Sequence, residues 1–196
     1  MKLWFASFAL GTAALFAVPT AMTSASGQTP QLRLTAFAVN MSNIGAGSTA
    51  TVDITIDRWS TDDERQTLIT TFTERGPEKL LDALQRLKRV GFIRLPNTVG
   101  YDLQFARERP LDEGGRQIII ATDRRIGFWE ATNQPRSIDY PFTVIELRLN
   151  RDGEGEGKMS IATKIIADKE QNIVTLENWD TSPVQLTNVK RERVSE

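Results

Sequence analysis

One irregular connection in the sequence gathers cationic and aromatic side chains that could bind a ligand. It lies between two predicted strands and carries four candidate binding residues, Arg124, Arg125, Trp129 and Arg136. Guanidinium groups stack on aromatic rings and pair with anionic groups, so this set could form a pocket for a carbohydrate or an anionic ligand. The sequence favours the alternative that Phe128 and Trp129 cap one end of the sheet, with the arginines lying over them in water.

Three carboxylates in the same region are the candidates for catalysis. They are Asp123, Glu130 and Asp139. Glycoside hydrolysis needs two carboxyl groups about 5 to 9 Å apart on opposite sides of the scissile bond. The spacing of the three residues along the chain does not select such a pair. A carboxylate-dependent hydrolase acting on glycans or esters is therefore an alternative function.

The chain contains no histidine and no cysteine. This composition excludes Ser-His-Asp and Cys-His nucleophiles, zinc sites with histidine ligands, haem ligation by histidine or cysteine, and thiol redox chemistry. No catalytic motif is recognisable in the remaining residues. We therefore predict no cofactor and no metal, and we favour a protein that is not an enzyme.

The segment 150–157 superficially resembles a calcium-binding loop. Its sequence, NRDGEGEG, places side-chain oxygens at alternate positions with glycines between them. A calcium loop needs a bidentate acid at its twelfth position, and that position is Ile161. The segment also joins two predicted strands instead of two helices. We expect a solvated hairpin tip here.

Helical periodicity appears in two consecutive stretches, at about residues 61–75 and 77–90. Residues 61–64 form a capping-box pattern, with acids in the first turn where the helix dipole favours them. Gly76 separates the two helices, and Gly91 ends the second. A pair of helices is the strongest local prediction in the chain.

Strand periodicity covers most of the remaining chain. Val52, Ile54 and Ile56 alternate with polar residues, as in a strand with one buried face. The predicted strands are residues 31–40, 49–59, 101–107, 116–122, 142–150, 158–167, 173–176 and 184–189. Short connections with turn residues join antiparallel neighbours. We expect an α+β fold, in which a curved antiparallel sheet of about seven or eight strands has the two-helix pair packed on one face.

The first 25 residues have the features of a cleavable signal peptide. Lys2 precedes the apolar run Leu3–Val18, and small residues then allow cleavage after Ala25 or after Gly27. The run is shorter than the roughly 20 residues that span a bilayer. A flexible leader at 26–30, one globular domain at 31–190 and a frayed tail at 191–196 are expected to follow.

The composition of the mature protein favours a location outside the cytoplasm of a bacterium. No cysteine lies near the cleavage site to carry a lipid anchor, and an exported domain without disulfides fits a bacterial periplasm or medium. Removal of residues 1–25 leaves 23 basic against 25 acidic groups, which argues against nucleic-acid binding. We expect a periplasmic or secreted protein that is not stably inserted in a membrane after signal cleavage.

Several stretches resemble a group of uncharacterised exported bacterial proteins. They are TDDERQTLITTFTERGPEKLLDALQRLKRVGFIRLP, GYDLQFARERPL, TDRRIGFWEA and RSIDYPFTVIELRLNRDGEGEGKMS. The resemblance covers nearly the whole mature chain. It implies export from a bacterial cell and transfers no activity, ligand or catalytic residue.

The predicted function is that of a non-enzymatic binding module. An apolar or amphipathic ligand, such as a lipid-like molecule, or an envelope protein would bind between the concave sheet and the helical pair. The outline is similar to helix-grip and lipocalin-like lipid carriers, although the long C-terminal helix of the helix-grip fold has no counterpart here. A structural or assembly component of the cell envelope is a further alternative, and the sequence leaves the oligomeric state open.

Overall fold

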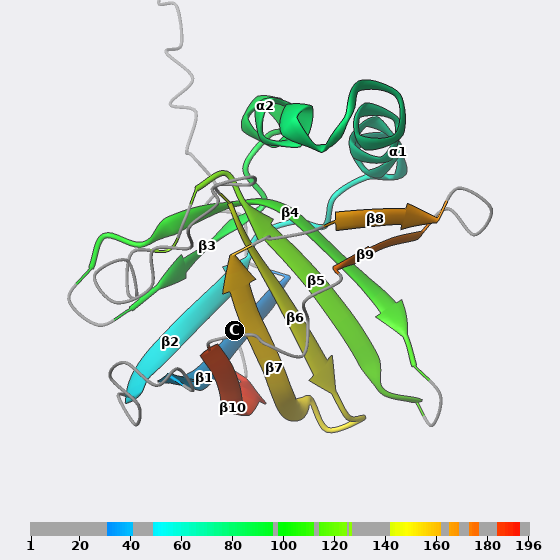
Figure 1. The fold of residues 1–196 in the computed structure, drawn as a ribbon. Coiled ribbons are helices and arrows are strands. Elements are labelled where there is room, and N and C mark those ends of the chain that lie inside the picture. The colour runs from blue at the N-terminus through cyan, green and yellow to red at the C-terminus, as the bar shows by residue number, and fades with distance from the viewer. Residues whose placement is uncertain are drawn as a thin grey trace, which may run out of the picture.

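Eight antiparallel strands close on one another to form a barrel in the computed structural model of this chain (Figure 1). The structure describes residues 31–40, 49–95, 98–111, 114–124, 126, 142–161, 165–168, 173–176 and 184–192. The predicted signal peptide and leader lie outside these residues. Around the barrel wall the strands are β1 (Leu32–Asn40), β2 (Thr49–Ile56), β3 (Gly91–Arg94), β4 (Tyr101–Pro110), β5 (Arg116–Thr122), β6 (Thr143–Leu149), β7 (Glu154–Ile161) and β10 (Val184–Arg191).

The prediction of an α+β fold with two helices and an antiparallel sheet of about seven or eight strands is confirmed, but the prediction of a curved sheet is wrong, because the eight strands close into a barrel. Strand β10 pairs antiparallel with β1, and this pairing joins the two edges that an open sheet would leave. A further antiparallel pair, β8 (Ile165–Asp168) with β9 (Ile173–Leu176), forms a separate two-stranded sheet. The sheet therefore has an inside and an outside instead of a concave and a convex face.

The inside of the barrel is apolar. Successive side chains of a strand point to opposite faces, so every second residue of each strand points inward. Ile54, Ile120 and Leu147 are among the inward residues, and all three are buried in one cluster that draws on every strand of the barrel. This cluster is the main core of the described structure.

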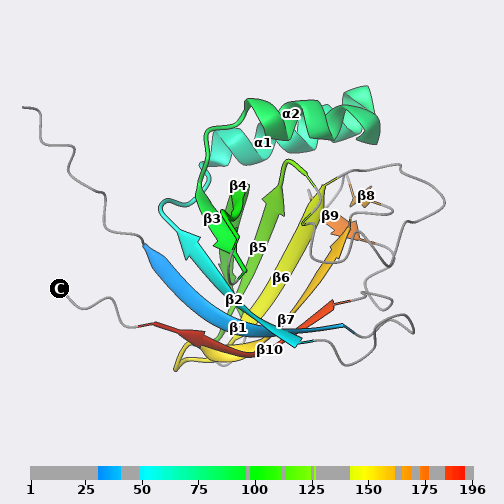
Figure 2. The same ribbon diagram turned by 90° about the vertical axis from the view of Figure 1, so that its left-hand side faces the viewer.

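The two predicted helices are present between β2 and β3. They comprise α1 (Asp62–Thr70), which continues as a π-helical turn at Thr71–Arg75, and α2 (Leu80–Arg86), which a 3₁₀ turn at Pro77–Lys79 precedes. Figures 1 and 2 show both helices at one end of the barrel. Leu84 of α2 lies in a second apolar cluster with Ala121 and Val144 of the barrel wall.

Helix α2 ends four residues earlier than the predicted boundary at residue 90. Val90 accepts the backbone N–H of Asp57 at 2.8 Å and donates its own N–H to Leu103 at 2.8 Å, which places it in the barrel core. Strand β3 begins at the next residue. The predicted start of the strand after the β6–β7 turn is also wrong, because β7 begins at Glu154 and not at Lys158.

In the part of the chain that the structure describes, no helix combines the length and the apolar character that crossing a lipid bilayer requires.

Candidate functional site

Of the four predicted binding residues, Arg124 is the one that the structure describes. Its Nε donates to Oδ1 of Asp123 at 2.9 Å and its Nη2 lies 3.3 Å from Oδ2. This hydrogen-bonded pair raises the pKa of the Arg124 guanidinium above its ordinary value. The Arg124 side chain is 62% exposed, whereas that of Asp123 is 11% exposed. The described contacts thus show a surface cation already paired with its chain neighbour.

The other predicted site residues cannot be placed against this pair. Arg125, Trp129 and Arg136 lie outside the described residues, as do the carboxylates Glu130 and Asp139. The described residues contain no group of three or more carboxylates that could hold a metal ion. The described residues therefore test neither the predicted pocket nor the predicted carboxylate pair.

Next to Arg124, the ends of β5 and β6 are joined by buried hydroxyl groups. Thr122 is fully buried, and its Oγ1 accepts the N–H of Thr143 at 3.0 Å and donates to the carbonyl of Arg124. Thr143 Oγ1 in turn accepts the N–H of Ile126 at 3.1 Å. Ile126 belongs to the main core, so this end of the barrel carries satisfied polar groups around an apolar side chain.

The neighbouring strand β4 carries a β-bulge at the same end of the barrel. Leu103 pairs with Thr122 and Phe105 pairs with Ala121, so Gln104 is an extra residue without a Cα partner on β5. Gln104 is 8% exposed, and its Oε1 has no hydrogen-bond partner. Among the described residues, Gln104 Oε1 is the single buried side-chain polar atom without a hydrogen-bond partner. No pattern in the sequence marks this residue.

The helical segment is attached to β4 immediately beyond the bulge. Ser60 donates its N–H to the carbonyl of Ala106 at 2.9 Å, and its Oγ accepts the Ala106 N–H at 3.1 Å. The Arg107 guanidinium lies 2.8 Å from the Asp62 carboxylate at the start of α1. These contacts fix the first residues of the helical segment against the barrel wall.

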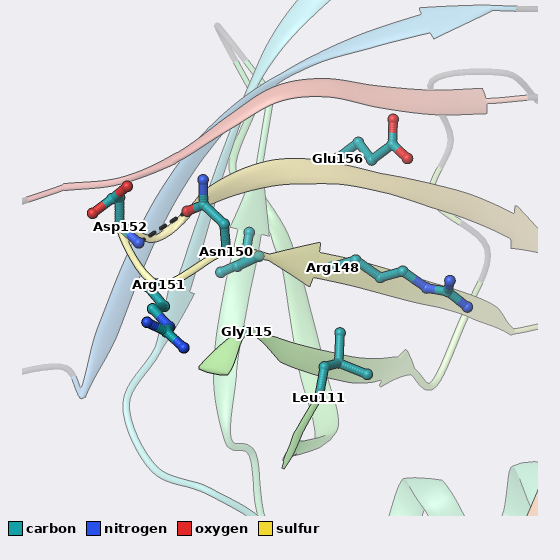
Figure 3. A pocket seen from close by; sticks show the side chains of 8 residues that line it. Leu111, Gly115, Arg148, Asn150, Arg151, Asp152 and Glu156 are labelled. Carbon is teal, nitrogen blue, oxygen red and sulfur yellow. Dashed lines mark hydrogen bonds between the residues drawn. The ribbon is translucent and has the colours of Figure 1, made fainter. Parts of the chain in front are cut away.

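The opposite end of the barrel carries an open groove of about 490 Å³ beside the β6–β7 turn (Figure 3). Asn150 Oδ1 accepts the backbone N–H groups of Asp152 and Glu154, each at 3.0 Å, which forms a tight hairpin turn. In Figure 3 the side chains of Arg148, Arg151 and Asp152 point in different directions. Arg148 pairs instead with Glu146 on its own strand, at 2.8 Å. The groove thus lacks a convergent set of polar groups.

The segment 150–157 is the hairpin tip and the start of a strand. The tip consists of residues 151–153, and Gly153 adopts a positive φ of 81°. Because both contacts of Asn150 Oδ1 are to backbone N–H groups, this oxygen is committed to the turn. The prediction of a hairpin tip is confirmed.

No protein-family model, curated protein or solved structure matches this chain.

Proposed function

We propose that this chain is an exported, non-enzymatic binding protein that holds an apolar or amphipathic small molecule inside its barrel. The observation that supports this function is a closed eight-stranded barrel whose described inward side chains form one aliphatic cluster. Antiparallel barrels of eight strands are just wide enough to be filled by side chains or to hold one small ligand. Transfer of an apolar ligand into such an interior is favoured by the hydrophobic effect.

The proposed site differs from the one that the sequence suggested. Leu80 and Leu84 of α2 share a cluster with Ala121 on the barrel wall, whereas the adjacent residue Ile120 belongs to the barrel core. Adjacent residues of a strand point to opposite faces, so the helices and the core lie on opposite sides of the wall. The apolar cluster of the interior draws on every strand of the closed barrel, whereas the cluster under the helices is smaller. The ligand site is therefore proposed for the interior.

Small inward residues offer a direct test of this site. Ala38 of β1 is fully buried in the main cluster, whereas Thr51 of the adjacent strand is exposed on the outside. The test variant is Ala38→Leu, which adds volume to the interior, and the matched control is Thr51→Leu. The probe is N-phenyl-1-naphthylamine, a neutral apolar dye that becomes fluorescent in apolar surroundings.

If the interior holds a ligand, Ala38→Leu lowers the affinity for the dye by about tenfold, which corresponds to about 1.4 kcal/mol, and leaves the protein folded. Thr51→Leu leaves the affinity unchanged. The proposal fails if the wild-type protein does not bind the dye. It also fails if Ala38→Leu binds the dye normally while losing about 1–3 kcal/mol of stability, the result expected for an interior already filled by side chains.

Native mass spectrometry of the protein from its own host tests the same proposal without a probe. A retained small molecule would appear as a defined added mass. A stoichiometric protein partner would instead favour the alternative of an envelope assembly component. The mass of the purified chain also tests export, because cleavage after Ala25 or Gly27 leaves a mature protein that starts at Ser26 or Gln28.

A further inference from the structure

We propose that the buried amide of Gln104 accepts a hydrogen bond from the ligand, so that the protein selects a neutral molecule with a hydroxyl group on an apolar body. This inference rests on the proposed function and specifies the ligand of the same site. The feature that carries it is a polar atom buried without a partner. Buried polar groups in proteins nearly always have one, from the protein, from water or from a ligand.

The β-bulge places Gln104 within the wall of the barrel beside the core. Leu103 and Ala106 are three residues apart, yet both are fully buried in the main cluster. Phe105, between them, belongs to the second cluster with the helices. An extra residue at position 104 is what allows residues at this odd spacing to share one face. Gln104 thus lies on β4 between two residues that line the barrel interior.

The other buried polar side chains around this end show how complete the local hydrogen bonding is. Ser60 Oγ accepts the N–H of Ala106, and Thr122 Oγ1 accepts the N–H of Thr143. Thr143 Oγ1 accepts the N–H of Ile126. Gln104 Oε1 differs from these groups, because each neighbouring hydroxyl has a backbone partner and this oxygen has no partner in the protein.

The acceptor determines which chemistry the ligand can have. A carbonyl oxygen needs a donor, which a hydroxyl supplies and an ionised carboxylate lacks. Two described cations close to this site along the chain are already paired with acids: Arg107 of β4 with Asp62 at 2.8 Å, and Arg124, which follows β5, with Asp123 at 2.9 Å. Burying an anion without a cation is costly. We therefore infer an alcohol in preference to a fatty acid or a pure hydrocarbon.

Three ligands of equal chain length separate these classes: dodecanol, dodecane and dodecanoate, each measured by displacement of the naphthylamine dye. The wild-type protein is expected to bind dodecanol about tenfold more tightly than the other two. Gln104→Leu is expected to lose this preference while its affinity for dodecane stays the same. Gln185→Leu, at an exposed position of β10, is the matched control and keeps the preference.

The outcomes distinguish this inference from the proposed function. If the wild-type protein binds none of the three ligands and not the dye, the proposed function itself fails. If it binds all three with equal affinity, or if Gln104→Leu keeps the preference for dodecanol, the role of Gln104 is overturned and the apolar site stands. Gln104→Met, which is closer in shape to glutamine, provides the same comparison should the leucine variant fold poorly.

Discussion

Arg58 and Glu64 are joined by two parallel hydrogen bonds of 2.9 and 2.8 Å at the start of α1. The same guanidinium donates to the backbone carbonyls of Lys88 and Arg89, which follow α2. Glu64 also accepts the N–H of the capping residue Thr61 at 2.8 Å. A single ion pair thus connects the first turn of the helical segment with the residues that lead back into the barrel.

This ion pair predicts a pH dependence of stability. The pKa of Glu64 is lowered, mainly because Arg58 donates hydrogen bonds to its carboxylate. A carboxyl whose pKa is lower in the folded protein stabilises the fold above its unfolded pKa of about 4.3, and this contribution is lost as the pH falls through the folded value. Because the pair is partly exposed, Glu64→Gln should lower the free energy of unfolding at pH 7 by about 1 kcal/mol.

Urea denaturation at pH 7 and pH 3 checks this expectation. The difference between wild type and Glu64→Gln should be present at pH 7 and smaller at pH 3, because the lowered pKa of Glu64 makes its contribution fall once the pH drops below the unfolded value. Glu74→Gln, an exposed residue of the π-helical turn, is the control and should differ little from wild type at either pH. An equal loss of stability at both values would show that the charge of Glu64 does not matter.

The hydroxyl of Thr122 should contribute more to stability than the volume of its side chain. Thr122→Val keeps the shape but removes the acceptor of the Thr143 N–H, which should cost about 1–3 kcal/mol. Thr122→Ser keeps the hydroxyl and loses one methyl group, which should cost about 1 kcal/mol. Urea denaturation of both variants shows which of them has the lower free energy of unfolding. A valine variant more stable than the serine variant would contradict the importance of this hydrogen bond.

Local signals in the sequence predicted local structure well. The capping box at residues 61–64 is present, with Thr61 Oγ1 accepting the N–H of Glu64 at 3.2 Å. Strands β5 and β9 have the predicted bounds, residues 116–122 and 173–176. These features depend on side chains a few residues apart, so their pattern is visible in a short window of sequence.

The closure of the barrel and the position of Gln104 were not predictable in this way. Closure depends on pairs such as Phe37 with Thr187, which are far apart in the chain. Strand β3 has only four residues, too few to show alternation. The bulge at Gln104 lies in a segment that reads as an ordinary strand, so nothing in the sequence marks the residue as extra. The predicted binding residues other than Arg124 lie outside the described residues.

Glycine in β7 permits a close approach between two strands of the barrel. A Cβ atom on Gly155 would lie 1.9 Å from the carbonyl oxygen of Arg148 on β6. Gly155→Ala therefore requires a backbone shift and should destabilise the protein by about 1–3 kcal/mol. Glu156→Ala, at the exposed next position, should have little effect. The prediction is wrong if the urea midpoints of the two variants agree.

Variants of Asn150 and added calcium test whether the side-chain oxygen of this residue closes the hairpin turn or binds a metal ion. Asn150→Ala removes the acceptor for the N–H groups of Asp152 and Glu154 and should cost about 1 kcal/mol. Asn150→Asp keeps an oxygen in the same place and should cost less. Added calcium should leave the thermal midpoint of the wild-type protein unchanged, since this oxygen already holds the turn. A rise in the thermal midpoint with calcium would show that the protein binds the metal ion. Equal losses of stability in the two variants would show that the oxygen of Asn150 does not stabilise this turn.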